Sequence, residues 1–364
     1  MAVTTAAATG PRVALHRRHG LIVLRGRRPA WSLSLHPRAL VVTIVLAVAT
    51  FLLLAWSLTV GDFPLPFGDV VATLVGRGSE DAAFIVERLR LPRGLTGVLV
   101  GAGFGVSGAI FQRVAGNPLA SPDLIGISSG AAAAAVFTVV VLGVEGPSVT
   151  LGALAGSLLT AASIYLLAHR GGVTGYRFVL IGIGAAAVLT STTHYLLTTA
   201  EIWEAHRALG WLAGSLNGRD WDHVRPIAST FAVLLPLGLL MCRQLRSLEL
   251  GDDTARGLGV RVEPARAGLL LVAVTLAAVG TASAGPIGFV ALVSPQIAQR
   301  LVGGRTVGLL PSAACGALLV VGADLIGRRL FAPTEIPVGI VTAVLGAPVL
   351  LFLLVRADRA GSGG

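Results

Sequence analysis

The sequence contains no lysine: all 28 of its basic residues are arginine. A P-loop uses a lysine to reach the β- and γ-phosphates of a bound nucleotide. The chain therefore cannot carry an ordinary ATP-hydrolysing P-loop. If ATP drives its activity, another subunit must supply the ATPase.

Charged residues are also scarce, at 13% of the 364 residues, whereas 54% are hydrophobic and the mean hydropathy is +0.82. Soluble domains have about 25% charged residues, so this composition excludes a soluble globular enzyme and a disordered chain. A membrane-spanning helix needs about 20 apolar residues. The apolar runs predict an all-α, polytopic membrane protein with about ten transmembrane helices, at 40–60, 92–113, 123–143, 148–168, 178–199, 225–242, 267–284, 287–302, 307–327 and 336–355.

This pattern predicts an Arg-rich N-terminal tail (1–39), a transmembrane domain (40–356) and a short C-terminal tail (357–364). Most of the arginines fall in the first tail and in alternate loops, which include the long loop 243–266. Because cytoplasmic loops carry an excess of Arg and Lys, we expect both termini and this loop to be cytoplasmic.

Residues that could carry covalent or metal chemistry are few. The two cysteines, Cys242 and Cys315, lie in or beside apolar runs and are expected to pack there. GISSG (126–130) matches the GxSxG pattern of hydrolases with Ser128 at the nucleophile position, but it opens an apolar helix without the strand-to-helix turn that a nucleophile elbow needs. We predict no catalytic residue and no metal site, and an intramembrane hydrolase is a disfavoured alternative.

Glycines at regular spacing predict closely packed helices. Gly97, Gly101 and Gly105 recur on one face of the second expected helix, and Gly152 with Gly156 repeats the spacing on the fourth. Small residues at this spacing let helix backbones approach closely in lipid.

Few polar residues interrupt the expected spans. In TSTTHY (190–195), hydroxyls such as those of Thr190 and Thr193 either bond back to carbonyls of their own helix or line a water-filled path, and His194 favours the path. Asp324 is the one carboxylate expected within a span, and Arg328, one turn later, can pair with it. An ion-coupled carrier normally needs buried carboxylates or histidines, so this scarcity disfavours an ion-coupled secondary transporter, which is the alternative function.

The loop 243–266 carries signals for two short helices. Asp252 and Asp253 favour the start of one and Arg256 its end, and Glu263 with Pro264 favours the start of another. Together they would form a polar docking platform on the membrane surface, the alternative being a solvated loop.

RLPRG (90–94) places Arg90 and Arg93 just before a span on the outer side, against the positive-inside tendency. Glu87 could compensate these charges, Arg93 could extend its head toward water, or an acidic external partner could bind them.

Four long motifs resemble the iron-siderophore and vitamin B12 permease family of bacterial ABC importers. They are RLPRGLTGVLVGAGFGVSGAIFQRVAGNPLASPDLIGISSG (90–130), LGDDTARGLGV (250–260), GPIGFVALVSPQIAQRLVG (285–303) and ADLIGRRLFAPTEIPVGIVTAVLGAPVLLFLL (323–354). The resemblance implies the vitamin B12 permease-like fold. AGSLNGRDW (213–221) and ELGDDTA (249–255) are most similar to ferric-enterobactin permeases.

The resemblance also implies partners and site residues. The partners are a second permease subunit, two cytoplasmic ATPases that use ATP and Mg²⁺, and an extracytoplasmic substrate-binding protein; this chain would bind no cofactor. The implied sites are docking of the binding protein at Arg90, Arg93 and Arg328; ATPase coupling at Leu250, Gly251, Asp252, Asp253, Arg256 and Gly259; a cytoplasmic gate at Asn117, Pro118 and Leu119; and a translocation path along the fifth and tenth helices. Gln296 stands where the family commonly has His.

We therefore expect a multi-pass, non-enzymatic permease subunit of the bacterial inner membrane that imports a ferric siderophore of the enterobactin type.

Overall fold

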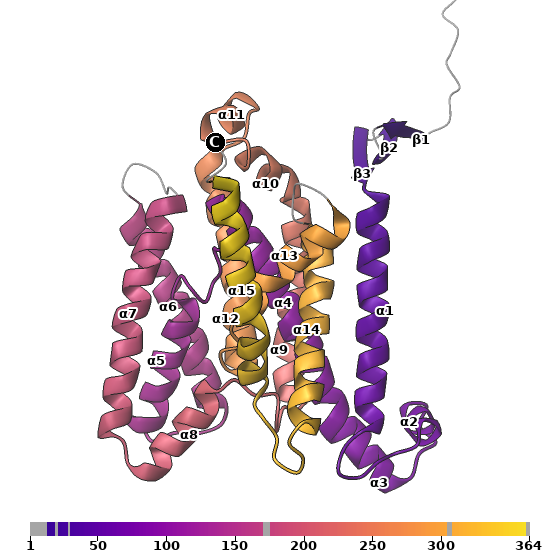
Figure 1. The fold of residues 1–364 in the computed structure, drawn as a ribbon, viewed down its shortest axis with the longest axis vertical. Helices are drawn as coiled ribbons and strands as arrows, with labels where there is room; N and C mark the ends of the chain where they lie inside the picture. Colours follow the sequence, from indigo (N-terminus) through magenta and orange to yellow (C-terminus); the bar gives the residue numbers. More distant parts are fainter. Residues whose placement is uncertain (1–12, 19–20, 28–29, 170–174, 304–307, 362–364) are drawn as a thin grey trace, which may run out of the picture.

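The computed structural model describes residues 13–18, 21–27, 30–169, 175–303 and 308–361 (Figure 1). Within these ranges, a helix occupies the place of each of the ten expected spans. They are α1 (Pro37–Thr59), α4 (Leu91–Ala115), α5 (Ile127–Val140), α6 (Pro147–Ala168), α7 (Gly175–Thr199), α9 (Trp221–Leu240), α12 (Val262–Ala284), α13 (Val290–Val302), α14 (Leu309–Arg329) and α15 (Val338–Gly361).

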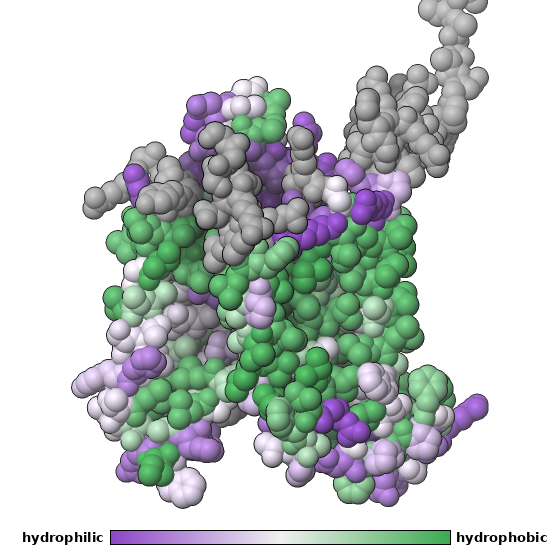
Figure 2. All heavy atoms as spheres, in the orientation of Figure 1, coloured by the Kyte–Doolittle hydropathy of each residue, from purple (hydrophilic) through white to green (hydrophobic). Residues whose placement is uncertain are grey.

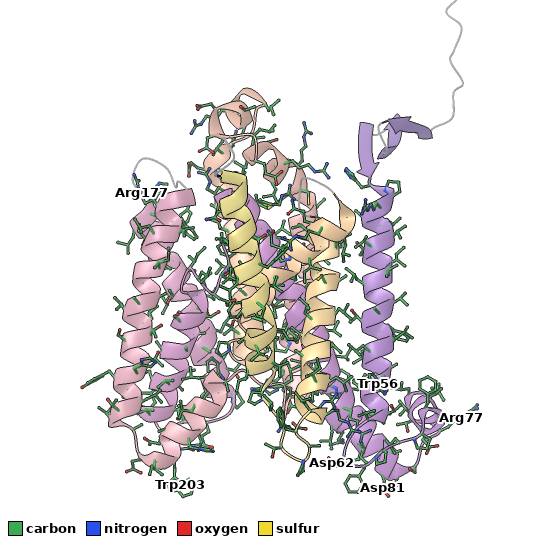
Figure 3. All side chains as sticks on the ribbon, in the orientation of Figure 1. Trp56, Asp62, Arg77, Asp81, Arg177 and Trp203 are labelled. Carbon is green, nitrogen blue, oxygen red and sulfur yellow. The ribbon has the colours of Figure 1, made fainter. Side chains whose placement is uncertain are left out.

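Side-chain chemistry divides this bundle into a hydrophobic belt and two polar ends (Figure 2). Seven of the described helices are long and apolar enough to cross a membrane, and α5 and α15 add shorter apolar segments. Asp62, Arg77 and Asp81 lie at one end, and Arg177 lies at the other (Figure 3). The predicted polytopic helical fold is confirmed.

Shorter helices distinguish the two ends. One end carries α2 (Phe67–Leu74), α3 (Glu80–Ala83) and α8 (Ile202–Leu212), and we refer to it as the α2 end. The opposite end, the α11 end, carries α10 (Cys242–Leu248) and α11 (Asp252–Gly257) together with the C-terminal end of α15 (Figure 1).

Two element boundaries differ from the sequence prediction. The second span does not begin at Pro92, because a continuous helix runs from Glu80 through a π-helical turn, η1 (Phe84–Arg90), into α4. Proline lacks an N–H and clashes with the carbonyl four residues earlier, and the wider turn accommodates both effects. α15 continues to Gly361 beyond the predicted start of the C-terminal tail at 357, and residues 362–364 lie outside the described residues.

The N-terminal tail departs from the all-α expectation. Its described part forms a three-stranded antiparallel sheet of β1 (Val13–Arg18), β2 (Leu21–Arg27) and β3 (Ala30–Leu35), placed next to α1 at the α11 end (Figure 1). The register pairs Leu15 with Leu24, and Leu24 with Leu33. Residues 1–12 of the tail lie outside the described residues.

α4 and α12 form the centre of the bundle. Buried residues make up 83% of the most apolar window of the helix that ends in α4 and 78% of that of α12, but only 11% of those of α1 and α7. The hydrophobic surfaces of α1 and α7 are consequently left to face lipid or a partner chain.

The glycine spacing on α4 has the predicted effect. A Cβ at Gly101 would collide with the backbone of Gly316 on α14, and one at Gly105 would collide with the backbone of Ser312. The two helices therefore cross in direct backbone contact, as small-residue packing in membranes allows. On α6, Gly156 packs against the backbone of Gly130 on α5, and Gly152 packs against the side chain of Thr138 on the same helix.

Candidate functional sites at the two ends of the bundle

A cluster of arginines and carboxylates joins α4 to α14 at the α2 end. Arg93 lies 2.9 Å from Asp324 and 3.0 Å from Glu335, and Arg328 lies 3.2 Å from the second carboxylate oxygen of Asp324. The side chains of Arg93, Asp324 and Arg328 are only 13%, 7% and 11% exposed. The predicted pairing of Asp324 with Arg328 is confirmed, and Arg93 joins it from a position 231 residues away.

Arg90 is held by main-chain carbonyls and not by the carboxylates of this cluster. Its guanidinium donates to the carbonyls of Leu58 at 2.7 Å and Phe63 at 2.5 Å, and so it ties η1 to the end of α1. Glu87 does not compensate Arg93, contrary to one of the sequence-based alternatives; Asp324 and Glu335 do.

These three arginines line one cavity of about 340 Å³ at the α2 end. Arg88 and Arg329 also line it, and both are exposed. The cavity is thus lined both by exposed arginines and by arginines that are bonded to neighbouring groups. Neither Arg88 nor Arg329 was predicted as a site residue, although Arg88 lies two positions before Arg90 and Arg329 directly follows Arg328.

At the α11 end, the segment predicted as a docking platform, 243–266, contains the short helices α10 and α11, and we refer to these two helices as the platform. α11 begins at Asp252 and ends with Arg256 in its last turn, and the side chains of Asp253 and Arg256 form an exposed ion pair at 2.8 Å. Leu250 and Leu258 are 61% and 59% exposed.

One detail of the predicted platform was wrong. Glu263 and Pro264 do not start a second short helix, because they belong to the first turn of α12, which begins at Val262. The second short helix is instead α10, before the motif. Gly251 and Gly259 flank α11 with φ of +93° and +79°, a conformation that favours glycine.

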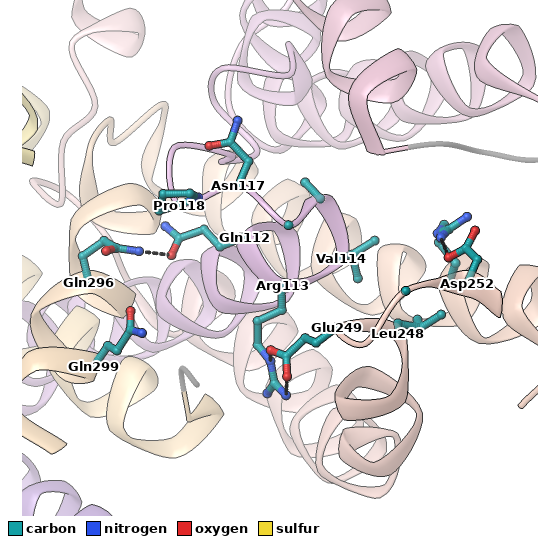
Figure 4. Close-up of a pocket in the computed structure, with 14 residues that line it drawn as sticks. Gln112, Arg113, Val114, Asn117, Pro118, Leu248, Glu249, Asp252, Gln296 and Gln299 are labelled. Atoms are coloured by element: carbon teal, nitrogen blue, oxygen red, sulfur yellow. Dashed lines mark hydrogen bonds and ion pairs between the residues drawn. The ribbon is translucent and has the colours of Figure 1, made fainter. Parts of the chain in front are cut away.

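The turn after α4 places the predicted gate residues beside this platform. Gly116 ends α4 in the left-handed conformation, and the Asn117 side chain accepts from the Leu119 N–H at 2.9 Å. Asn117 and Pro118 line a cavity of about 340 Å³ together with Gln112, Glu249 and Gln296 (Figure 4). The structure thus brings the segments predicted as gate and as coupling site to one cavity.

Gln296 has a hydrogen-bonding role in this cavity wall. It is buried and donates to the side-chain oxygen of Gln112 at 2.6 Å, and Gln112 in turn donates to the carbonyl of Leu292 at 2.9 Å. The amide therefore links α13 to α4 without a titrating group.

The residues proposed for the translocation path divide between two environments on α7. Thr193 is buried and donates to the carbonyl of Leu189 at 2.9 Å, as in the back-bonding alternative. Thr190 and His194 are exposed. These two side chains are placed where they could face a path or a partner chain; Thr193 is not.

GISSG packs a helix start and does not form a nucleophile elbow. Gly126 precedes α5 with φ of +88°, a conformation that favours glycine, and a Cβ there would lie 3.1 Å from the backbone of α7. Ser128 donates to the carboxylate of Asp123 at 2.5 Å. Burial raises the pKa of Asp123 to about 6, against the opposing effect of that hydrogen bond.

The described residues contain no group of three or more His, Cys, Asp or Glu that could hold a metal ion. Cys242 and Cys315 are unpaired thiols there, as the packing interpretation predicted.

Sequence comparison decides the family. Residues 46–356 match the FecCD transport family. The chain belongs to this family. Its relatives in the family include the ferric enterobactin transport system permease protein FepG of Escherichia coli, 42% identical over 88% of this chain and 98% of FepG. The achromobactin transport system permease protein CbrC of Dickeya dadantii is 40% identical over 87% of this chain and 90% of CbrC.

Other FecCD relatives have different names. The Fe(3+) dicitrate transport system permease protein FecD of Escherichia coli is 38% identical over 87% of this chain and 98% of FecD. A solved structure of a metal-chelate type ABC transporter in an inward-facing conformation matches with a TM-score of 0.76 and 26% identity, over 87% of this chain and 99% of that one. The FecCD chain is thus a siderophore or iron-chelate ABC permease subunit, and it is not itself an enzyme.

Proposed function

We propose that this permease moves a ferric siderophore of the enterobactin type across the bacterial inner membrane. The observation that carries the proposal is the 42% identity to FepG along nearly the whole of both chains. Relatives with citrate and hydroxamate names are 38% identical. The difference in identity therefore favours a catecholate siderophore, the class to which enterobactin belongs, by a small margin.

The partners proposed are a second permease subunit, two cytoplasmic ATPases that consume ATP and Mg²⁺, and an extracytoplasmic binding protein. The exposed apolar surfaces of α7 and α15, which include Val188, Tyr195 and Val344, support a second permease subunit. The exposed Leu250 and Leu258 support ATPase docking on α10 and α11. Both termini and the α11 end are then cytoplasmic, as the arginine distribution predicts.

The binding protein is proposed to dock at the α2 end through the arginine-lined cavity. Because Asp324 already neutralises much of the charge of Arg93 and Arg328, these two residues hold the docking surface in shape while exposed Arg88 and Arg329 meet acidic groups first. Arg90 fixes the neighbouring loop in the same surface.

The transport cycle follows from this arrangement. A loaded binding protein docks at the α2 end, and ATP binding draws the ATPases together at the α11 end. The platform of α10 and α11 moves with them and changes the access of the path from one side of the membrane to the other. Specificity resides in the binding protein, so that weak contacts along the path allow release.

The test is uptake of radiolabelled iron by cells that express the complete transporter. We expect uptake with enterobactin to exceed uptake with hydroxamate or citrate chelates, and to be lost with vanadate. Equal uptake of all three chelates would refute the catecholate assignment. Uptake that survives vanadate and collapses with a protonophore would favour an ion-coupled secondary transporter.

A further inference from the structure

The last turn of α4 is bonded to α13, to the platform and to the predicted gate turn at Asn117 and Pro118. Gln112 and Arg113 are adjacent in this turn, and both are buried, at 4% and 8% exposure. Gln112 is bonded to α13, as described above. Arg113 reaches the opposite way, toward the segment between α10 and α11 (Figure 4).

Arg113 and Glu249 form a two-point ion pair. The guanidinium lies 2.5 Å and 3.2 Å from the two carboxylate oxygens, and the side chains are 6% and 21% exposed. Such bidentate pairing of Arg with a carboxylate fixes geometry as well as energy. Breaking a buried pair leaves an uncompensated charge, so the two segments are expected to stay together when either one moves.

A second ion pair holds the platform to α12. Arg266 lies 2.6 Å from Asp252 at the start of α11, and the side chain of Arg266 is 8% exposed. The platform is thereby fixed to α4 at one point and to α12 at another. It is therefore built to move with these central helices.

The gate turn is fixed to the same two residues of α4. The Asn117 N–H donates to the carbonyl of Gln112 at 3.1 Å, and the Gly116 N–H donates to that of Arg113 at 3.4 Å. Only three residues separate Arg113 from Asn117. A shift of Glu249 therefore reaches the turn through one ion pair and one helical turn of backbone.

We propose that Arg113 and Glu249 form a coupling latch, which transmits displacement of the α10–α11 platform to the Asn117–Pro118 turn. Both are positioning residues, since they act through the turn and need not touch the siderophore. The proposal rests on the proposed function, because it takes the platform to be the surface on which an ATPase docks.

The experiment compares the complete reconstituted transporter carrying Glu249→Gln or Arg113→Gln with the wild type. Asp222→Asn is the control, since Asp222 and Arg225 form an exposed pair within α9 at 3.6 Å. For each variant we would measure retention of the ATPase subunits, the melting temperature, ATP hydrolysis and iron-siderophore uptake. We expect both latch variants to retain the ATPases and to hydrolyse ATP, with uptake per ATP reduced at least tenfold.

Wild-type uptake per ATP in Arg113→Gln, whose side chain is 6% exposed and so adds little to the docking surface itself, would overturn the latch. Loss of the ATPase subunits from Arg113→Gln would also overturn it, because the pair would then serve assembly. If the wild-type transporter itself shows no ATP-dependent uptake, the proposed function fails instead, independently of the latch.

Discussion

Replacing Asp324 with Asn is expected to destabilise the protein strongly. Asp324 is 6% exposed and is paired with the guanidinium groups of both Arg93 and Arg328. The neutral amide of Asn would leave the largely buried guanidinium groups of Arg93 and Arg328 close together, with one of their two neighbouring carboxylates removed. Breaking a buried pair by removing one partner costs about 3–5 kcal/mol.

The size of the loss depends on Glu335, which still pairs with Arg93. We therefore take the lower end of the range, about 3 kcal/mol. In domains of 150–250 residues, 1 kcal/mol shifts the melting temperature by about 2–4 °C. The expected decrease is about 6–12 °C, measured by thermal unfolding of the purified permease in detergent.

Two matched variants make this test specific. Glu335→Gln removes a partner that is 38% exposed, and exposed pairs contribute only about 0–1 kcal/mol. Asp222→Asn removes a pair whose side chains are 82% and 76% exposed and should change nothing measurable. If the melting temperature of Asp324→Asn falls no further than that of Asp222→Asn, this cluster does not stabilise the contact between α4 and α14.

Three further predictions concern other parts of the molecule. Gly101→Ala should destabilise the permease by about 1–3 kcal/mol, because the new methyl group collides with the backbone of α14. Gly68→Ala is the control, since Gly68 lies in open space on α2. Equal melting temperatures for the two variants would contradict the close crossing of α4 and α14. Because burial raises the pKa of Asp123 to about 6, the folded state holds this proton more tightly than the unfolded state, and the contribution to stability is lost as the pH rises toward and through 6. When the pH is lowered from 7.5 to 5, the melting temperature of the wild type should therefore rise relative to that of Asp123→Asn. If the melting temperatures of the two proteins change in parallel with pH, the pKa of Asp123 is not raised. Reversing Arg88 and Arg329 to Glu should weaken binding of the loaded binding protein about tenfold, or about 1.4 kcal/mol, without lowering the melting temperature; unchanged affinity would place docking elsewhere.

Some site residues were predictable from the sequence because their interactions are local. Asp324 and Arg328 are one helical turn apart, so their pairing follows from the helix alone. Asp252 and Arg256 marked the ends of α11 for the same reason. The alternation in Trp31–Leu35 was the available signal for β3, but the arginine content of the tail obscured it.

The partners of Arg93 and Arg113 could not be predicted. Arg93 pairs with Asp324 across 231 residues, and Arg113 pairs with Glu249 across 136. No spacing rule relates such positions, since the contact depends on which helices are neighbours in the bundle. An arginine at the end of a glycine-rich, apolar helix was the only hint that Arg113 would be buried with a partner.

The sequence by itself determined the membrane location, the ten helices and the close approach of α4 to a neighbour. These properties depend on hydropathy over about 20 residues and on small residues at helical spacing, which are local quantities. Only the tertiary structure decided that α14 is that neighbour, that Asp324 pairs with two arginines, and that an ion pair joins the last turn of α4 to the segment between α10 and α11. Those outcomes depend on how the helices pack, because a charge buried in the bundle is stable only where another helix brings its partner within contact distance.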